Sequence, residues 1–389
     1  MRTLLPHLPR GVPAPGGTKR DGSRPRAPGI RVRMNSPASK GLRVVVTGAS
    51  GNVGTSTVEA LSRDPAVASI LGVVRREPEW RVPKLEWRTA DLAEDQIAHL
   101  VRGADVVIHL SWLFQPTHDP ALTWRSNVLG AIRVFEAVAR ENVPAVVYSS
   151  SVGTYSPGPK DSPVTESWPT HGWPAAAYPR EKAYLERYLD GFEKANPGVR
   201  VVRLRPAFIF KREAASAQRR LFAGPFLPGS LARPSLIPVV PDIPGLRVQA
   251  VHSADIGEAF RLAAMKDVRG AFNIAADPVV DAKALARLLG ARTVPVPTWA
   301  IRGVVAAGWY AHLLPASPGL LDTVLRLPIM DTTRARDELG WTPRHDGLEA
   351  IGEFLAGLRA GAGMATPPLT PDNAPTRIQE VRTGIGNRP

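Results

Sequence analysis

Residues 44–56 read VVVTGASGNVGTS, a β-branched run that leads directly into three glycines, Gly48, Gly51 and Gly54. In a strand–turn–helix unit one glycine permits the tight turn, the next lets the backbone approach a pyrophosphate, and the last lets helix and strand pack closely. The first turn of the helix then offers free N–H groups and the positive end of its dipole to an anion. Glycines at this spacing would also suit a purely structural turn, so the interpretation depends on residues further along the chain.

Apolar runs alternate with helical stretches over the N-terminal half of the chain. Continuous apolar strands that alternate with amphipathic helices are typical of a parallel sheet covered by helices on both faces. Right-handed crossovers make such a sheet doubly wound, with a ligand crevice at the carboxyl ends of its strands. We therefore predict an α/β fold with a doubly wound parallel sheet of the Rossmann type over residues 41–205. The expected strands are 42–47, 67–74, 105–110, 144–150 and 199–205, and the expected helices are 53–62, 120–141 and 175–194.

The regular alternation ends near residue 205, and residues 206–250 are rich in Pro and Gly. We expect residues 206–361 to form a smaller, mixed α/β lobe that binds the substrate and is interleaved with the last strands of the sheet. The elements expected there are strands at 247–252 and 271–275 and helices at 253–264, 280–290 and 344–359.

Residues 1–40 hold nine Lys and Arg residues and a single acidic residue, Asp21, so they carry more than half of the formal net charge of +14. This segment is also rich in Pro and Gly and has no apolar period, so we expect a disordered basic extension. Met34 is an alternative start of the native chain. Because the excess charge is concentrated in this extension, we expect no nucleic-acid partner. Residues 362–389 are expected to form a second disordered tail.

The composition excludes several kinds of site. The chain has no Cys, which excludes disulfides, thiolate nucleophiles and Cys-based metal sites and suits a cytoplasmic location. No apolar run is long enough to span a bilayer, so we expect no membrane partner; residues 299–314 are the nearest candidate, but they contain Arg302. His109 and His252 have no second ligand at metal spacing, so we expect structural roles for them and no metal.

A serine run and a tyrosine–lysine pair are the candidate catalytic groups. Residues 148–155 read YSSSVGTY, and Tyr178-Pro-Arg-Glu-Lys182 begins 27 residues after Ser151. A tyrosine and a lysine four positions apart share one face of a helix, and a nearby ammonium group lowers the pKa of a phenol. With a serine hydroxyl on the same substrate oxygen, this trio suits proton transfer to or from a hydroxyl or carbonyl while a hydride moves to or from a nicotinamide.

The strand expected at 67–74 is followed by Arg75 and Arg76. In this fold an acidic residue at that position bonds the 2′-hydroxyl of the adenosine ribose, whereas a basic residue accommodates a 2′-phosphate. The two arginines therefore favour NADP as the cofactor. Binding of NAD, with both arginines as solvated surface charges, is the alternative.

In combination these motifs resemble the extended short-chain dehydrogenase/reductase superfamily and, within it, the NAD-dependent epimerase/dehydratase family. The resemblance covers roughly residues 42–360 and is clearer in the N-terminal half. The matching pieces are TGASGNVG at 47–54, ADL at 90–92, VVIHLS at 106–111, NVLGAIRVFEA at 127–137, YSSSVGTY at 148–155, YPREK at 178–182, RLRP at 203–206, VHSADIGEAF at 251–260 and LGWTPR at 339–344.

The resemblance implies a role for each matching position. Tyr178 would be the acid/base, and Lys182 would hold the nicotinamide ribose while lowering the pKa of Tyr178. Ser151 would orient the substrate oxygen, with Ser149 and Ser150 as alternatives in the same run. The implied catalytic residues are thus Ser151, Tyr178, Lys182 and Asn127, the last as an organiser of the central helix and of a proton relay.

The implied cofactor site extends from the glycine turn to the end of the strand at 199–205. Asp91 and Leu92 would contact adenine, and Leu110, Ser111 and Pro206 would lie on the nicotinamide side. The full implied set is Gly48, Ser50, Gly51, Asn52, Val53, Gly54, Arg75, Arg76, Asp91, Leu92, Leu110, Ser111, Tyr178, Lys182 and Pro206.

The chain departs from the family pattern at the catalytic helix. Glu181 stands where a small residue usually precedes the lysine, and Pro179 follows the tyrosine directly. Proline is tolerated in the first turn of a helix, so we expect this helix to begin just before Tyr178.

Further departures lie where the substrate should bind, so they leave its identity open. Loop aromatics could line an apolar substrate site or cover the core, and arginines could pair with the diphosphate of a nucleotide sugar or be ordinary surface charges. The aromatics are Trp112, Phe114, Trp168 and Trp173, and the arginines are Arg212, Arg219, Arg220 and Arg233.

We therefore predict an NAD(P)-dependent oxidoreductase or epimerase that acts on a hydroxyl or carbonyl of a small-molecule substrate. A nucleotide-sugar epimerase or dehydratase that recycles its cofactor is one alternative, and a non-catalytic NAD(P)-sensing protein is another. A homodimer through the long helices is expected from the resemblance alone.

Overall fold

The computed structural model describes residues 41–115, 117–226 and 236–385 of the chain. The basic extension expected at residues 1–40 lies outside the described residues. From Gly41 onward the chain forms one compact unit, so residue 205 does not separate two independent bodies.

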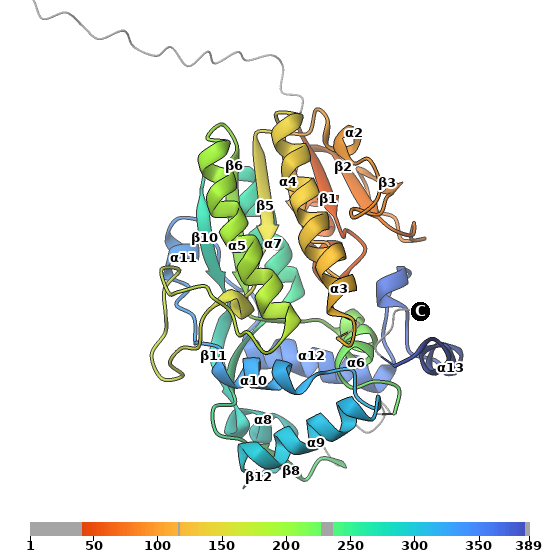
Figure 1. Ribbon diagram of the computed structural model, residues 1–389, viewed down its shortest axis with the longest axis vertical. Helices are drawn as coiled ribbons and strands as arrows, with labels where there is room; N and C mark the ends of the chain where they lie inside the picture. The colour runs from red at the N-terminus through yellow and green to blue at the C-terminus, as the bar shows by residue number, and fades with distance from the viewer. Residues whose placement is uncertain (1–40, 116, 227–235, 386–389) are drawn as a thin grey trace, which may run out of the picture. The chain divides into compact units, whose positions relative to one another are not determined.

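A seven-stranded parallel sheet forms the centre of this unit (Figure 1). Its strand order is β10-β6-β5-β4-β1-β2-β3. The order reverses between β1 and β4, and α/β sheets bind their ligands outside the carboxyl ends of strands at such a switch point. The predicted doubly wound parallel sheet is confirmed. The strands are β1 (Leu42–Thr47), β2 (Val67–Val74), β3 (Leu85–Thr89), β4 (Val106–His109), β5 (Ala145–Ser149), β6 (Arg200–Pro206) and β10 (Gly270–Ile274).

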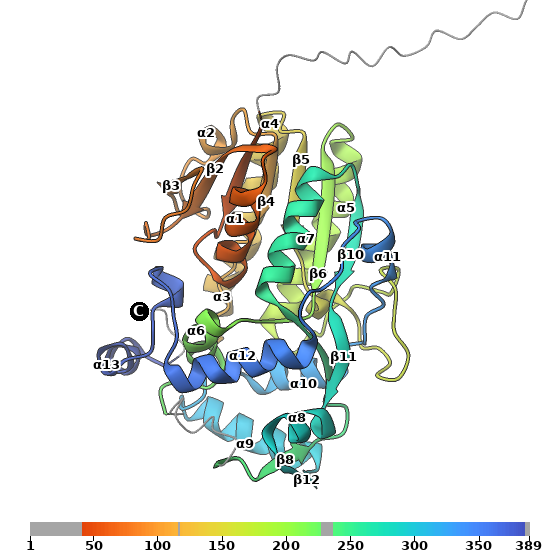
Figure 2. The ribbon, with the colours of Figure 1, turned by 180° about the vertical axis from the view of Figure 1, so that it is seen from behind.

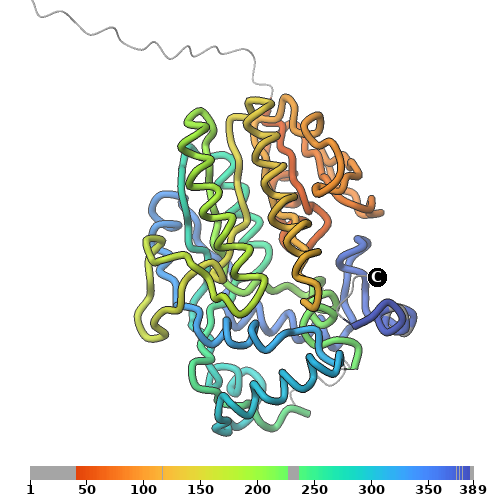
Figure 3. Tube along the Cα trace, in the orientation of Figure 1, coloured from red at the N-terminus to blue at the C-terminus, as the bar shows by residue number. Residues whose placement is uncertain are grey.

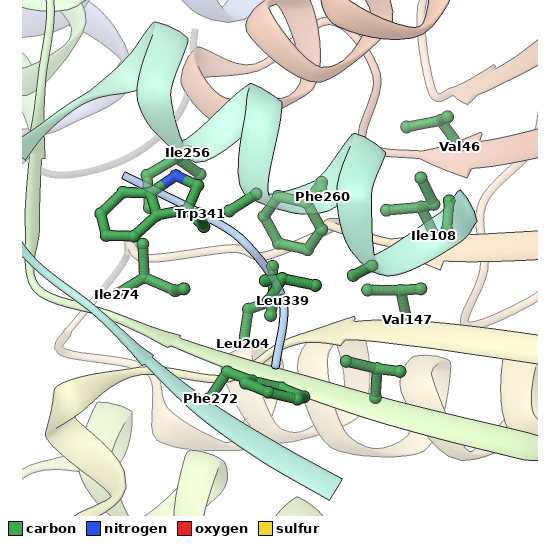
Figure 4. Packing of buried hydrophobic residues seen from close by; sticks show 14 of the residues in the cluster. Val46, Ile108, Val147, Leu204, Ile256, Phe260, Phe272, Ile274, Leu339 and Trp341 are labelled. Atoms are coloured by element: carbon green, nitrogen blue, oxygen red, sulfur yellow. The ribbon is translucent and has the colours of Figure 1, made fainter. Parts of the chain in front are cut away.

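Helices cover both faces of this sheet, which is why its central strands are apolar on both sides. Helices α1 (Asn52–Arg63) and α7 (Ser253–Met265) lie on the face seen in Figure 2. Helices α4 (Gly130–Arg140) and α5 (Ala177–Ala195) lie on the face seen in Figure 1. Figure 4 shows the hydrophobic core between α7 and the sheet. The core residues labelled there are Val46, Ile108, Val147, Leu204, Ile256, Phe260, Phe272, Ile274, Leu339 and Trp341.

The helix expected at 120–141 is interrupted by a wider turn. It consists of α3 (Pro120–Thr123), a π-helical turn η1 (Trp124–Leu129) and α4. Such π-turns occur often at functional sites because they re-aim a side chain within a helix. Here the π-turn contains Asn127, one of the predicted catalytic residues.

Strand β3 was not among the expected strands. Its sequence, LEWRT, buries only Trp87, and it pairs with β2 alone at the edge of the sheet. A half-exposed edge strand has no continuous apolar run, which was the signal used for the other strands.

The second half of the chain builds a smaller lobe and also returns one strand to the main sheet. Strand β10 follows lobe segments in the sequence but pairs with β6, as the trace in Figure 3 shows. The lobe strands form a three-stranded sheet and a two-stranded sheet. The three-stranded sheet contains β7 (Phe208–Phe210), β9 (Arg247–His252) and β11 (Ala276–Asp281), and the two-stranded sheet contains β8 (Val239–Asp242) and β12 (Arg292–Pro295).

The remaining elements are short or belong to the lobe. The helices of the lobe are α6 (Ala215–Phe222), α8 (Ala282–Leu289), α9 (Thr298–Tyr310), α10 (Pro318–Arg326) and α12 (Gly347–Ala360). Helix α11 (Thr333–Asp337) lies beside β10 at the edge of the main sheet (Figure 1). Elsewhere lie α2 (Ala98–Val101) and the 3-10 turns η2 (Val152–Thr154) and η3 (Arg212–Ala214).

Residues 362–385, which we call the C-terminal segment, differ from the expected disordered tail. They contain a 3-10 turn, η6 (Pro367–Leu369), and helix α13 (Ala374–Thr383). Leu369 is buried, and Glu380 is buried against Arg219 of α6. The segment is rich in Pro and poor in apolar residues, so its composition suggested disorder although a few contacts hold it in place.

Candidate active site

The glycine turn between β1 and α1 has the geometry that its spacing predicted. Gly48 has a φ of +72°, and a Cβ on it would lie 2.7 Å from the Ser111 nitrogen. A Cβ on Gly54 would lie 2.2 Å from the Gly48 oxygen, so this position needs glycine for α1 to pack on the turn. A Cβ on Gly51 would meet only the Gly48 oxygen at 3.5 Å, so the backbone there is open to a ligand.

The N-terminus of α1 leaves donors available for an anion. Gly51 is the N-cap and has no side chain to accept from the first N–H groups of the helix. The Asn52 side chain donates to the Ile209 oxygen at 3.3 Å, and its Oδ1 atom is buried without a partner among the described residues. Free backbone donors at a helix N-terminus fit the pyrophosphate of a dinucleotide.

A cavity of about 160 Å³ lies beside this turn, at the carboxyl ends of β1, β2 and β4. Ten predicted site residues line it, whereas Asn52, Val53, Gly54, Ser151, Pro206, Tyr178 and Lys182 do not. The ten are Gly48, Ser50, Gly51, Arg75, Arg76, Asp91, Leu92, Leu110, Ser111 and Asn127. The cavity is also lined by residues that the motifs did not predict, namely Val73, Val74, Ala90, Leu113, Ser126, Pro367 and Pro368, and by Trp112, which was not assigned to the cofactor.

The residues that follow the neighbouring strands β2 and β3 bring different chemistry to the cavity. Arg75 and Arg76 are exposed at the end of β2. The Asp91 carboxylate, which follows β3, accepts from the Ala93 nitrogen at 2.9 Å. Leu92 is buried beside it. A phosphate group of a bound cofactor could pair with the guanidinium groups of the two arginines. Its adenine ring could lie against Asp91 and Leu92.

Ser151 is the serine of the run that contacts the predicted catalytic tyrosine. Its hydroxyl hydrogen-bonds the Tyr178 phenol and accepts from the Gly153 nitrogen at 2.9 Å. The other two serines have different partners. The Ser150 hydroxyl donates to Glu186 at 2.5 Å, and the backbone carbonyl of Ser149 accepts from the Lys182 ammonium group.

Tyr178 lies in the first turn of α5, which begins at Ala177 as expected. Its ring contacts Trp112 at 5.7 Å and Phe114 at 4.8 Å between centroids. Burial raises the pKa of Tyr178 to about 12, although the bond from Ser151 acts in the opposite direction. Trp112 therefore joins the cavity to the tyrosine, because it also lines the cavity.

Lys182 bonds the backbone of the serine run, and its expected lowering of the Tyr178 pKa stays a prediction. Its Nζ atom donates to the Ser149 oxygen at 2.7 Å and lies 3.5 Å from the centroid of the Trp112 ring. The distance from Nζ to the centroid of the Tyr178 ring is 6.0 Å. Burial lowers the pKa of Lys182 well below its usual range, so the lysine is a weaker source of positive charge than the motif suggested.

Glu181, which replaces the usual small residue, holds the predicted relay residue. The Asn127 amide donates to Glu181 at 2.7 Å and to the Leu113 oxygen at 2.8 Å, and it accepts from the Leu113 nitrogen at 2.6 Å. The Thr123 hydroxyl donates to the second Glu181 oxygen at 2.6 Å. Burial raises the pKa of Glu181. The carboxyl thus fixes the π-turn and the loop after β4 relative to α5.

The aromatic and basic residues expected near the substrate take separate roles. Trp168 packs against the core, and Trp173 lies under the Arg326 guanidinium, so only Trp112 and Phe114 reach Tyr178. Arg219 and Arg220 bond the C-terminal segment and are not free to pair with a diphosphate. Arg212 is exposed, and Arg233 lies outside the described residues.

The two histidines have structural contacts. His109 is buried and shares a 2.7 Å hydrogen bond with the Thr47 hydroxyl, and burial lowers its pKa to about 3. The fold brings His252 near Asp255 and His345, with ligand atoms within 4.8 Å of one another, although no sequence spacing indicated it. Asp255 accepts from both the backbone and the ring of His345 at 3.0 Å, and these bonds join α7 to the start of α12.

Comparison with known proteins agrees with this geometry. The NAD dependent epimerase/dehydratase family model matches residues 44–275, which is more than half of the chain. An uncharacterized protein of Mycobacterium tuberculosis is 27% identical over 327 residues, covering 81% of this chain and 83% of that protein. UDP-glucose 4-epimerase of Erwinia amylovora is 29% identical over 180 residues, covering 42% of this chain and 52% of that protein. The structure of Thermus thermophilus UDP-glucose 4-epimerase in complex with NAD has a TM-score of 0.61 at 20% identity and covers 82% of this chain and 100% of that chain.

The fold and the family match define the class of this protein. It is an enzyme of the extended short-chain dehydrogenase type, with a Rossmann-like nucleotide-binding sheet. The chain belongs to the NAD dependent epimerase/dehydratase family. Over the described ranges, no helix combines the length and the apolar character needed to cross a membrane.

Proposed function

We propose that this enzyme uses NAD(P) to oxidise or reduce the carbon that bears a hydroxyl or carbonyl in a small-molecule substrate, with Tyr178 as the acid/base. The observation that carries the proposal is the hydrogen bond between the Ser151 hydroxyl and the Tyr178 phenol. The ring of Tyr178 packs against Trp112, and Trp112 also lines the cavity at the glycine turn. Trp112 therefore contacts both the proposed proton-transfer group and the proposed cofactor site.

Each side chain has a defined task in this proposal. A bound nicotinamide supplies the acceptor or donor of the hydride at the substrate carbon. In the oxidation direction the Tyr178 phenolate takes the hydroxyl proton, and in the reduction direction the phenol gives a proton to the carbonyl oxygen. Ser151 holds that oxygen in place, and Lys182 turns from Ser149 to the ribose of the cofactor. Asn127, held by Glu181, fixes the loop that carries Trp112.

The cofactor preference is proposed to be NADP over NAD. Arg75 and Arg76 line the cavity at the end of β2, where the adenosine ribose is bound in this fold. Two guanidinium groups there can form charge-assisted hydrogen bonds with the 2′-phosphate of NADP. The 2′-hydroxyl of NAD carries no charge and gains less from these groups.

A nucleotide-sugar epimerase is the second candidate function. UDP-glucose 4-epimerases are among both the sequence relatives and the structural neighbours, which favours it. A cofactor that copurifies and does not exchange during turnover would support this candidate, because an epimerase reduces and reoxidises its cofactor within one cycle. Net change of nicotinamide absorbance during turnover would support a dehydrogenase instead.

Substitution of two neighbouring serines tests the proposed site. The loss of one donor to a reacting oxygen costs roughly 10²–10³ in kcat, and we expect a fall of this size in Ser151→Ala. Ser149→Ala is the matched control, because it keeps the carbonyl that Lys182 bonds and should retain nearly full turnover. The substrate is first found by following nicotinamide absorbance with candidate alcohols, aldehydes and nucleotide sugars. Equal turnover by the two variants would contradict the assignment.

A further inference from the structure

The C-terminal segment reaches the cavity that the glycine turn lines. Pro367 and Pro368 of η6 line this cavity together with Gly48, Arg75 and Ser111. These prolines are well over 200 positions from the other lining residues in the sequence, and they follow the lobe rather than the sheet.

Backbone and side-chain bonds tie the segment to both sides of the cavity. On the side of the sheet, the Trp80 nitrogen in the connection between β2 and β3 donates to the Ala365 oxygen at 3.2 Å. Near the start of α1, Lys211 lies 3.8 Å from the Met364 sulfur and donates to the Thr55 hydroxyl at 2.7 Å. The segment therefore crosses from the first turns of α1 to the residues beyond the end of β2.

On the side of the lobe, two arginines of α6 hold the segment. Arg220 donates to the Pro368 oxygen at 3.1 Å and to the Thr370 oxygen at 2.9 Å. Arg219 is buried and pairs with Glu380 at 3.0 Å and with Asp372 at 3.2 Å. Removing one partner of a buried ion pair is costly, so these bonds give the segment a defined position.

We infer that the C-terminal segment is part of the dinucleotide site and covers the pyrophosphate and adenosine ribose of the bound cofactor. This inference rests on the proposed function, which puts the pyrophosphate at the glycine turn and the ribose at Arg75. Pro367 and Pro368 form part of the cavity wall together with the glycine turn. Two prolines suit this task because their fixed φ leaves little conformational entropy to lose on binding.

The size of the cavity indicates how the segment acts. Its volume is about 160 Å³, whereas sites that enclose small-molecule ligands have roughly 300–1,000 Å³. The segment therefore has to shift outward as a dinucleotide enters and then closes over it. A shift of η6 breaks the contacts of Arg220 with the Pro368 and Thr370 oxygens and moves Leu369 relative to Ala214 and Ala217, while the ion pairs of Arg219 hold the rest of the segment. The cofactor should accordingly leave slowly from the intact chain.

Binding of NADPH and NADH to three variants of the full chain tests this inference. A chain that ends at Gly361 lacks the segment, and Arg220→Ala removes its two bonds to the segment. Arg212→Ala is the matched control, because Arg212 is an exposed arginine of the neighbouring turn η3. Dissociation constants and dissociation rates are measured by cofactor fluorescence, with melting temperatures recorded for each variant.

We expect the truncated chain to bind at least roughly tenfold more weakly and to release the cofactor faster, which corresponds to about 1.4 kcal/mol. Arg220→Ala should show a smaller change in the same direction, and Arg212→Ala none. Where the truncated chain fails to fold, Arg220→Ala decides the question. Unchanged or tighter binding in Arg220→Ala or the truncated chain would overturn the inference. If the intact chain binds neither dinucleotide, the proposed function fails instead.

Discussion

The protonation state of Tyr178 depends on the residues that surround its ring. Trp112 and Phe114 pack against the half-buried ring of Tyr178, and burial raises its pKa to about 12. At pH 7 the phenol is then protonated. In this state the residue is a proton donor, which suits reduction of a carbonyl. For oxidation of a hydroxyl, Lys182 must leave the Ser149 oxygen and bring its charge nearer to the phenol.

The two arginines after β2 lead to a prediction about the cofactor. Arg75→Ala and Arg76→Ala should each raise the dissociation constant of NADPH roughly tenfold, because a charge-assisted bond to phosphate contributes about 1.5 kcal/mol. The dissociation constant of NADH should change little, since NADH lacks the 2′-phosphate. Arg63→Ala, at the other end of α1, is the control. Tighter binding of NADH than of NADPH by the unaltered chain would contradict the proposed preference.

At the scale of elements, a buried carboxylate joins α5, β5 and β6 beneath the serine run. Glu186 of α5 accepts from Ser150 at 2.5 Å, from Arg205 at 2.9 Å and from Arg203 at 3.1 Å. Burial alone would raise the pKa of Glu186, but the two arginines outweigh it and lower the pKa to about 2. This network sets the position of the serine run relative to the helix that carries Tyr178.

Glu186→Gln should therefore destabilise the fold. Breaking a buried ion pair by removing one partner costs about 3–5 kcal/mol. The unfolded carboxyl titrates near 4.3, above the folded value. The stabilisation is thus fully present above that pH and is lost as pH falls toward 2. Denaturant unfolding at pH 7 and at about pH 3 measures it, because much of the stabilisation is lost at the lower pH. Glu136→Gln, an exposed carboxyl on α4, is the control, and equal unfolding free energies for the two variants at pH 7 would contradict the account.

At the scale of the whole molecule, the sheet and its covering helices could be predicted because their residues are apolar in continuous or periodic runs. The strand expected at 42–47 and the helix start before Tyr178 are examples that the structure confirms. The edge strand β3 escaped prediction because only Trp87 of its residues is buried. Its signal was too weak to separate it from a loop.

The cofactor site could likewise be predicted only in part from the sequence. The residues around the glycine turn could be predicted directly from the strand–turn–helix pattern, and they meet at one cavity. Pro367, Pro368 and the role of Glu181 could not be predicted, because each depends on which distant segments the fold brings together. The composition of the C-terminal segment suggested disorder, but the fold gives that segment partners such as Arg219 and Arg220 on α6 and Trp80 after β2.

Tyr178→Phe decides whether Tyr178 transfers the proton beside a bound nicotinamide dinucleotide. This variant keeps the ring packing against Trp112 and Phe114 but removes the hydroxyl that bonds Ser151. Turnover and the dissociation constant of NADPH are measured on the same preparation. We predict that turnover falls at least roughly 10²-fold, as expected when a general acid is lost, while the dissociation constant stays within about twofold. Full retained turnover in Tyr178→Phe would contradict the account.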